Sequence, residues 1–136
     1  MNAFEDLKIW QIARQLCDEV FQLYKSSDLQ YDKVLWNQMN KSSGSIMDNI
    51  AEGFERNGNR EFRQFLSVAK ASCGELRSQC YRCHDRAYLD ESQFKELRGK
   101  LVRQSQMISH LLKHVSHSEM KGAKFIPISP GPDEIS

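Results

Sequence analysis

Apolar residues recur along most of the chain in alternating steps of four and three positions. The longest uninterrupted series comprises Phe62, Leu66, Ala69, Cys73, Leu76, Cys80, Cys83 and Ala87, and a shorter one comprises Ile9, Ala13, Leu16, Val20 and Leu23. This spacing places apolar side chains on one face of an α-helix. The pattern predicts four long helices, at about residues 4–25, 32–56, 60–88 and 90–117.

Polar residues and glycine mark the expected helix ends. Gly58 suits a left-handed C-terminal cap of the second helix, and Asn59 suits an N-cap of the third. Asp90 is expected to cap the fourth helix. All three prolines lie between residues 127 and 132, so residues 119–136 are predicted to form a flexible C-terminal tail behind a helical domain of residues 1–118.

The predicted fold class is all-α. Short connections make sequential helices antiparallel, which predicts an up-down-up-down four-helix bundle. The chain has 136 residues, of which 40% are hydrophobic and 27% charged, and this suits one globular domain. The sequence contains no apolar run long enough to cross a membrane and no N-terminal secretory signal, so we expect a cytoplasmic protein.

The second predicted helix carries small and polar residues at positions that should face its neighbours. In an antiparallel pair of helices turning at residues 57–60, residue i lies opposite residue 117 − i. This register predicts three facing pairs: Ser45 with Ser72, Ser42 with Glu75, and Gln38 with Gln79. Because buried polar groups need hydrogen-bond partners, we expect a polar layer between the two helices, with Glu75 accepting from Ser42 or Ser43.

The same two helices carry a series of residues that is typical of one protein family. It consists of Ser45-Ile46-Met47-Asp48-Asn49-Ile50-Ala51-Glu52-Gly53, followed by Glu61-Phe62, Phe65-Leu66, Ala69, Ser72, Glu75-Leu76 and Gln79, and preceded by Phe4-Glu5-Asp6-Leu7, Trp10-Gln11 and Gln38. With these residues the chain resembles the four-helix-bundle proteins encoded in intervening sequences of bacterial large-subunit ribosomal RNA. A related branch is the accessory variability determinant of diversity-generating retroelements.

The resemblance implies a ring-like homopentamer of four-helix bundles. For the retroelement branch it also implies a basic surface that binds RNA and a reverse transcriptase, although this chain is more similar to the intervening-sequence branch. It has Asn40-Lys41 where the family often has two arginines. We interpret the signature positions as structural, with a ligand site as the alternative; they are Gln38, Ser42, Ser45, Asn49, Glu52, Gly53, Ser72, Glu75 and Gln79.

Basic residues are concentrated in the second half of the chain. Residues 95–124 hold seven bases and two acids, a net charge of +5, whereas the whole chain has a net charge of +1. If the fourth helix ends beside the turn between the second and third, one end of the molecule becomes a basic pole, and an oligomer would repeat it. The RNA-binding residues predicted there are Arg56, Arg60, Arg63, Lys113, Lys121 and Lys124.

Two patterns are compatible with metal or haem binding. Cys80-Tyr81-Arg82-Cys83-His84 has the spacing of covalent haem attachment, and Cys73 could add a zinc ligand. His110, His114 and His117 lie on one helix face. Because the cysteines occupy core positions of the apolar series, we interpret them as packing residues and expect no cofactor and no metal.

No catalytic motif is present, so we expect no enzymatic activity. The leading hypothesis is a homo-oligomeric adaptor that binds structured RNA, or an RNA–protein complex, through basic patches. The alternative is an oligomeric protein–protein scaffold without nucleic-acid binding, which would use the surplus apolar surface of the first helix or the faces of the ring.

Overall fold

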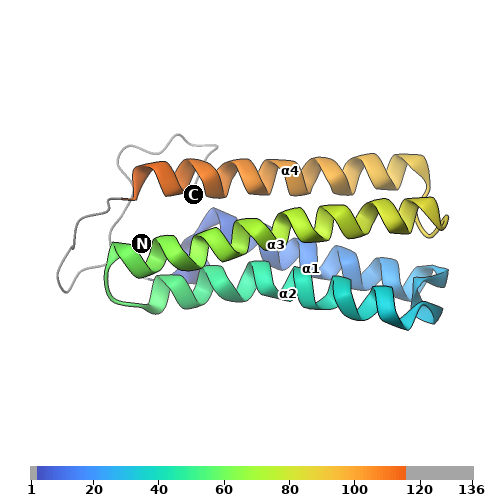
Figure 1. Cartoon of the computed structure of the whole chain (residues 1–136), viewed down its shortest axis with the longest axis horizontal. Helices are drawn as coiled ribbons and strands as arrows, with labels where there is room; N and C mark the ends of the chain where they lie inside the picture. The colour runs from blue at the N-terminus through green and yellow to red at the C-terminus, as the bar shows by residue number, and fades with distance from the viewer. Residues whose placement is uncertain (1–2, 116–136) are drawn as a thin grey trace.

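The computed structural model describes residues 3–115, and these residues form four long α-helices and no strand. The long helices are α1 (Lys8–Ser26), α2 (Lys33–Glu55), α3 (Asn59–Asp85) and α4 (Glu91–His114), and two short 3-10 helices, η1 (Phe4–Asp6) and η2 (Asp28–Tyr31), precede α1 and α2. The long helices lie side by side along the longest axis of the molecule (Figure 1). The prediction of an all-α, four-helix fold is therefore confirmed.

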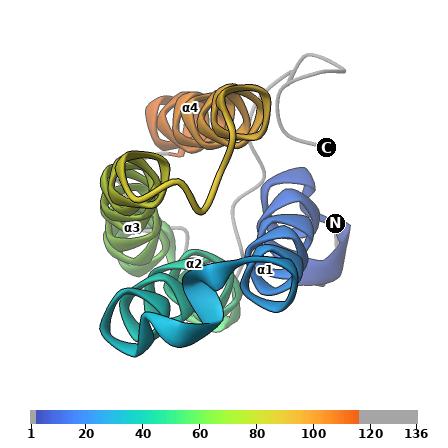
Figure 2. The same ribbon diagram turned by 90° about the vertical axis from the view of Figure 1, so that its right-hand side faces the viewer.

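The four helices surround one core in the order α1, α2, α3, α4 (Figure 2). The contact between α2 and α3 is the most extensive, and that between α1 and α4 is much smaller. The turn between α2 and α3 lies at one end of the molecule, and the connection between α3 and α4 lies at the other (Figure 1). Within the described residues, no helix is both long and apolar enough to span a membrane.

The apolar series seen in the sequence forms the core. Ile9, Ala13, Leu16 and Val20 of α1 are all buried, and so is every member of the longer series from Phe62 to Cys83. Its last member is different: Ala87 is exposed, because α3 ends at Asp85. Ala87 adopts the left-handed conformation, with a φ of 63°, and turns the chain toward α4.

The predicted helix ends are only partly correct. The first α-helix begins at Lys8, because residues Phe4–Asp6 form a 3-10 turn. Gly58 precedes α3 as its N-cap rather than ending α2, and Asn59 is the first residue of α3, where it is fully buried. Asp90 does cap α4: it accepts a hydrogen bond from the backbone of Gln93 and receives one in return, a capping box.

The C-terminal predictions fall largely outside the described residues. Helix α4 ends at His114, three residues short of the prediction. His117, Lys121 and Lys124, like the whole of the predicted tail at 119–136 and its boundary with the helical domain, lie outside the residues that the structure describes.

Candidate functional site

The polar layer between α2 and α3 is present. The Ser42 hydroxyl donates to Glu75 Oε1 at 3.2 Å, as predicted, and the hydroxyls of Ser45 and Ser72 share a hydrogen bond of 2.8 Å. Asn49 extends the layer because its amide donates to the Ser45 hydroxyl at 3.0 Å and to the Ser45 carbonyl at 2.8 Å. These bonds satisfy the buried serine hydroxyls and hold α2 and α3 in one register.

The third predicted pair of this layer is different. Gln38 is exposed, and its Oε1 accepts a hydrogen bond of 2.6 Å from Arg82. Gln79 is buried, and its Oε1 has no hydrogen-bond partner among the described residues. The two glutamines thus point away from each other, because Gln38 lies on the outer flank of α2 whereas Gln79 faces the interior. The simple register holds at the middle of the helices and fails here.

Two further signature residues act at the end of α2. A methyl group on Gly53 would lie 2.7 Å from Cβ of Phe65 and 3.2 Å from the Phe62 ring, so only glycine lets α3 approach this closely. Glu52 is on the surface and forms an ion pair of 2.8 Å with Arg56. Within the described residues, Asn49 and Gly53 therefore have structural roles, and Glu52 partly neutralises the nearest predicted RNA-binding arginine.

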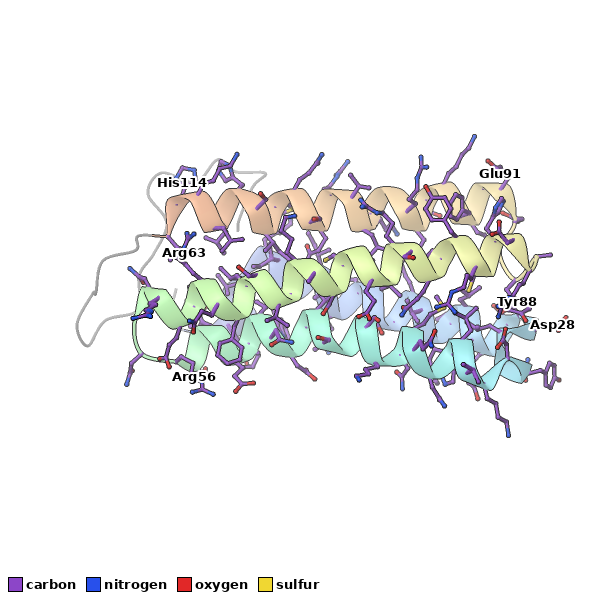
Figure 3. All side chains as sticks on the ribbon, in the orientation of Figure 1. Asp28, Arg56, Arg63, Tyr88, Glu91 and His114 are labelled. Atoms are coloured by element: carbon purple, nitrogen blue, oxygen red, sulfur yellow. The ribbon has the colours of Figure 1, made fainter. Side chains whose placement is uncertain are left out.

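Four of the six residues of the predicted basic pole are among the described residues, and they lie at the end of the molecule that holds the α2–α3 turn. Arg63 of α3 donates to the backbone carbonyls of Leu112 and Val115, the latter at 3.1 Å, so the end of α4 lies beside the start of α3 (Figure 3). Arg60 and Lys113 are exposed at this end. The placement of α4 beside the turn, on which the pole depends, is thus correct.

Two of the predicted RNA-binding arginines have partners within the chain. Arg63 caps the carbonyl end of α4, where a positive charge is favoured by the helix dipole. Arg56 pairs with Glu52, lies 3.9 Å from Glu61 and covers the ring of Phe65. Its pKa is raised, first by the hydrogen bond to Glu52. The role of Arg63 depends on tertiary packing, because its partners lie about 50 residues away in the chain. The Arg56–Glu52 pair is local, since the two residues are four positions apart, and the sequence could have indicated it.

The opposite end of the molecule is closed by Asp32. This residue caps α2 by accepting from the Leu35 amide, and its other oxygen accepts from the Tyr88 hydroxyl at 2.8 Å and from Arg86 at 2.7 Å. The hydrogen bond from Tyr88, followed by that from Arg86, lowers the pKa of Asp32 although burial opposes the shift. The cluster joins the start of α2 to the end of α3 (Figure 3 labels Tyr88 at this end).

The cysteine pattern belongs to the core. Cys73, Cys80 and Cys83 are buried, and burial raises the pKa of each thiol to about 12, so all three remain protonated at neutral pH. Cys83 contacts the sulfur of Met39 at 3.3 Å. His84, the last residue of the haem-like motif, instead pairs with Glu91 at 2.9 Å and stacks on Phe94.

The histidine pattern is only partly within the described residues. The rings of His110 and His114 lie 4.3 Å apart between centroids. Across the part of the chain that the structure describes, no three histidine, cysteine or acidic side chains come together in an arrangement suited to hold a metal ion.

Part of the basic stretch near the C-terminus is neutralised. Lys100 pairs with Glu19 at 2.8 Å, and Lys95 lies 3.6 Å from Glu91. Arg98 and Arg103 of the same stretch instead line a groove between α3 and α4, together with Arg77 of α3. We call it the α3–α4 groove; its walls include Gly74, Arg77, Tyr81, Arg98, Gly99 and Arg103. Arg77 was not among the predicted site residues, although it lies only two positions from Glu75 and from Gln79.

Comparisons with known proteins agree with this fold. A family model described as 23S rRNA-intervening sequence protein matches residues 5–110. The chain is also similar to a solved structure of unknown function from the S23 ribosomal protein family of Bacteroides thetaiotaomicron VPI-5482. The TM-score is 0.71 at 18% sequence identity, covering 77% of this chain and 98% of that chain. At this identity, the structural similarity shows a shared fold. No curated protein matches the chain.

Proposed function

Since the chain belongs to the family of 23S rRNA-intervening sequence proteins, we propose that it is a homo-oligomeric adaptor that binds structured RNA. In this proposal the chain is an antiparallel up-down-up-down bundle, and copies assemble into a ring, with a pentamer favoured. Each copy presents its basic pole, and the ring repeats that pole. Repetition converts a modest charge per copy into multivalent attraction for a polyanion. Such a protein would act in the cytoplasm, where ribosomal RNA is found.

The observation that carries the proposal is the contact of Arg63 with the end of α4. It brings the exposed side chains of Arg60 and Lys113, which are 53 positions apart in the chain, to one end of the molecule. Arg56 lies at the same end, although Glu52 neutralises part of its charge. Contacts of this kind with phosphate supply affinity and little sequence specificity.

The proposal assigns no catalytic role to the chain. A nucleophilic cysteine must ionise near neutral pH, and burial raises the pKa of Cys73, Cys80 and Cys83 to about 12. The Ser42–Glu75 hydrogen bond, which lies at the edge of the core because Glu75 is exposed, joins two helices. RNA binding at the surface needs neither group.

Self-assembly is supported by apolar side chains outside the core. Tyr31 and Val34 are 75% and 69% exposed near the start of α2, and Phe21 of α1 is 45% exposed beside Trp36. Exposed aromatic and aliphatic groups in one region favour contact with another protein surface. The same observation supports the second candidate function, an oligomeric scaffold whose ligand is a reverse transcriptase or another protein.

Light scattering and an RNA mobility shift test the proposal together. The expected results are a solution mass of several copies and binding to a structured RNA that weakens steeply between about 50 and 200 mM salt. Changing Arg60 and Lys113 to glutamine should weaken binding several-fold. Arg14→Gln with Lys33→Gln removes the same charge elsewhere and serves as the control. A monomeric chain, or RNA binding that does not respond to salt, would contradict the proposal.

A further inference from the structure

The α3–α4 groove gathers positive charge away from the basic pole. Arg77 lines it from α3, and Arg98 and Arg103 line it from α4, around a cavity of about 710 Å³. Among the described residues that line it there is no aspartate and no glutamate. Arg98 and Arg103 are five residues apart, which spans about 7.5 Å along the helix axis. The three guanidinium groups can therefore reach more than one negative group of a ligand.

Within residues 3–115 these arginines have no acidic partner, since none of the three forms an ion pair with a carboxylate. Arg98 instead donates to the Tyr81 hydroxyl at 3.2 Å and packs over the ring of Phe94, which restrains it beside the groove. Two of the three arginines of the pole differ, since Arg56 pairs with glutamate and Arg63 caps a helix.

Two of the residues that line the groove are glycines, which place no side chain in it. Gly74 and Gly99 lie in the interiors of α3 and α4, and a methyl group on either would meet no other atom within 4 Å. Packing therefore does not require glycine at these positions, and glycine weakens a helix there relative to alanine. The benefit they bring is open space next to the arginines, on both sides of the groove.

We propose that the α3–α4 groove binds the sugar-phosphate backbone of an unpaired RNA segment. Arg77, Arg98 and Arg103 hold the phosphates, and guanidinium groups suit this because they bind phosphate oxygens through two parallel hydrogen bonds. Tyr81, a residue that is 44% exposed, lies at the wall where a base can stack. The inference rests on the proposed RNA binding and adds a second contact surface to it.

RNA is favoured over an acidic peptide for two reasons. The charged side chains that line the groove are all positive and come from two helices. This arrangement suits RNA, which carries one negative phosphate per nucleotide. An acidic peptide would also leave the exposed ring of Tyr81 unused, whereas a base supplies a flat surface for it.

Fluorescence anisotropy with a labelled 16-nucleotide oligouridine tests the groove directly. We expect Arg77→Gln and Arg103→Gln each to weaken binding about five- to tenfold and to reduce the slope of log affinity against log salt by about 0.7. Arg14→Gln, on α1, is the matched control because α1 lies across the core from α3 (Figure 2). It should change affinity by less than about twofold and leave the slope unchanged.

A pair of glycine substitutions separates the groove from general effects on folding. Gly74→Glu places a bulky negative group in the groove, whereas Gly44→Glu makes the same change on α2, where a side chain also has open space. Both variants should keep the circular dichroism spectrum of the parent. We expect Gly74→Glu to weaken oligouridine binding by more than about tenfold and Gly44→Glu to have little effect.

Several results would overturn the inference. If the parent binds RNA and only substitutions of Arg60 and Lys113 matter, the groove is not a site while the proposed function stands. If the parent binds no RNA, both fail. A changed solution mass for Arg77→Gln would identify the groove as a contact between copies. Displacement of oligouridine by polyglutamate of equal charge would favour an acidic protein partner, and tighter binding of a 16-base-pair duplex would exclude an unpaired segment.

Discussion

Gly53→Ala tests whether the signature glycine is required by packing. The structure places a methyl group at this position 2.7 Å from Cβ of Phe65, 3.2 Å from Cδ1 of Phe62 and 3.5 Å from the Phe62 carbonyl oxygen. The atom that is too close is bonded directly to the α3 backbone. A rotamer change cannot relieve the contact, so α2 and α3 would have to move apart.

The magnitude follows from two opposing effects. Alanine is favoured over glycine in a helix interior by about 0.5–1 kcal/mol. Forcing an extra methyl group into a packed interface costs about 1–3 kcal/mol, and the close contact with Cβ of Phe65 places Gly53 in the upper part of that range. We expect Gly53→Ala to lower the free energy of unfolding by about 1–2 kcal/mol, and Gly44→Ala, which meets no atom, to raise it by about 0.5–1 kcal/mol.

Urea unfolding followed by circular dichroism measures both variants against the parent. All samples need the same protein concentration, because assembly would make the apparent stability depend on it. For a chain of this size, the loss at Gly53 corresponds to a melting temperature lower by about 3–8 °C. The reasoning is refuted if Gly53→Ala is as stable as the parent, or if the two alanine variants shift stability in the same direction.

Three further predictions concern the helix contacts. Glu75→Ala, which leaves the buried Ser42 hydroxyl unpaired, should cost about 1–2 kcal/mol in urea unfolding and more than Ser42→Ala; two neutral results would exclude the polar layer. Ala87→Gly should stabilise the chain by about 0.5–1 kcal/mol, because the left-handed φ of 63° disfavours alanine, and a loss would contradict this. The pKa of Asp32 is lowered, first by the hydrogen bond from Tyr88, from an ordinary value of 3.8. The stabilising effect of Asp32 is therefore full above that pH and disappears as pH falls through the lower folded value. The difference in free energy of unfolding between the parent and Asp32→Asn should therefore shrink as pH falls below the ordinary pKa of Asp32. A difference that stays constant with pH would refute this prediction.

The fold was largely predictable because it depends on a repeated local signal. From Phe62 to Cys83, apolar residues recur in alternating steps of four and three positions. This spacing identifies the buried face of the helix without any knowledge of the helices that pack against it. Helix ends depend on single residues and were harder. Asn59 has the chemistry of an N-cap, yet Gly58 takes that place and Asn59 is buried inside the first turn of α3. Ala87 fits the apolar series, but the turn after Asp85 exposes it.

The polar layer shows which tertiary contacts a sequence can indicate. The Ser42–Glu75 and Ser45–Ser72 pairs follow from counting residues outward from the α2–α3 turn, because α2 and α3 keep this register at the middle of both helices. The same count fails for Gln38 and Gln79, which differ in burial. Counting fixes height along a helix but not rotation about its axis, and rotation decides whether two polar side chains meet.

The candidate RNA-binding residues were harder to predict for the same physical reason. A basic residue is available to a ligand only if no neighbour already holds it, and that neighbour is often distant in the chain. Arg63 caps a helix that ends about 50 residues later, so its charge is committed. Arg77 shows no local sign of function, yet α4 brings two more arginines beside it.

The family signature and the free positive charge occupy different parts of the molecule. Ser45, Asn49 and Gly53 fix the distance and register of α2 and α3, through hydrogen bonds and a close backbone approach that few other residues permit. The arginines of the groove lie on the α3–α4 face and take no part in these α2–α3 contacts. If the groove binds RNA as proposed, substitutions on this face would change RNA binding without disturbing the α2–α3 contacts. A match to the signature consequently identifies the architecture, whereas the RNA binding proposed here would depend on side chains that lie outside the signature.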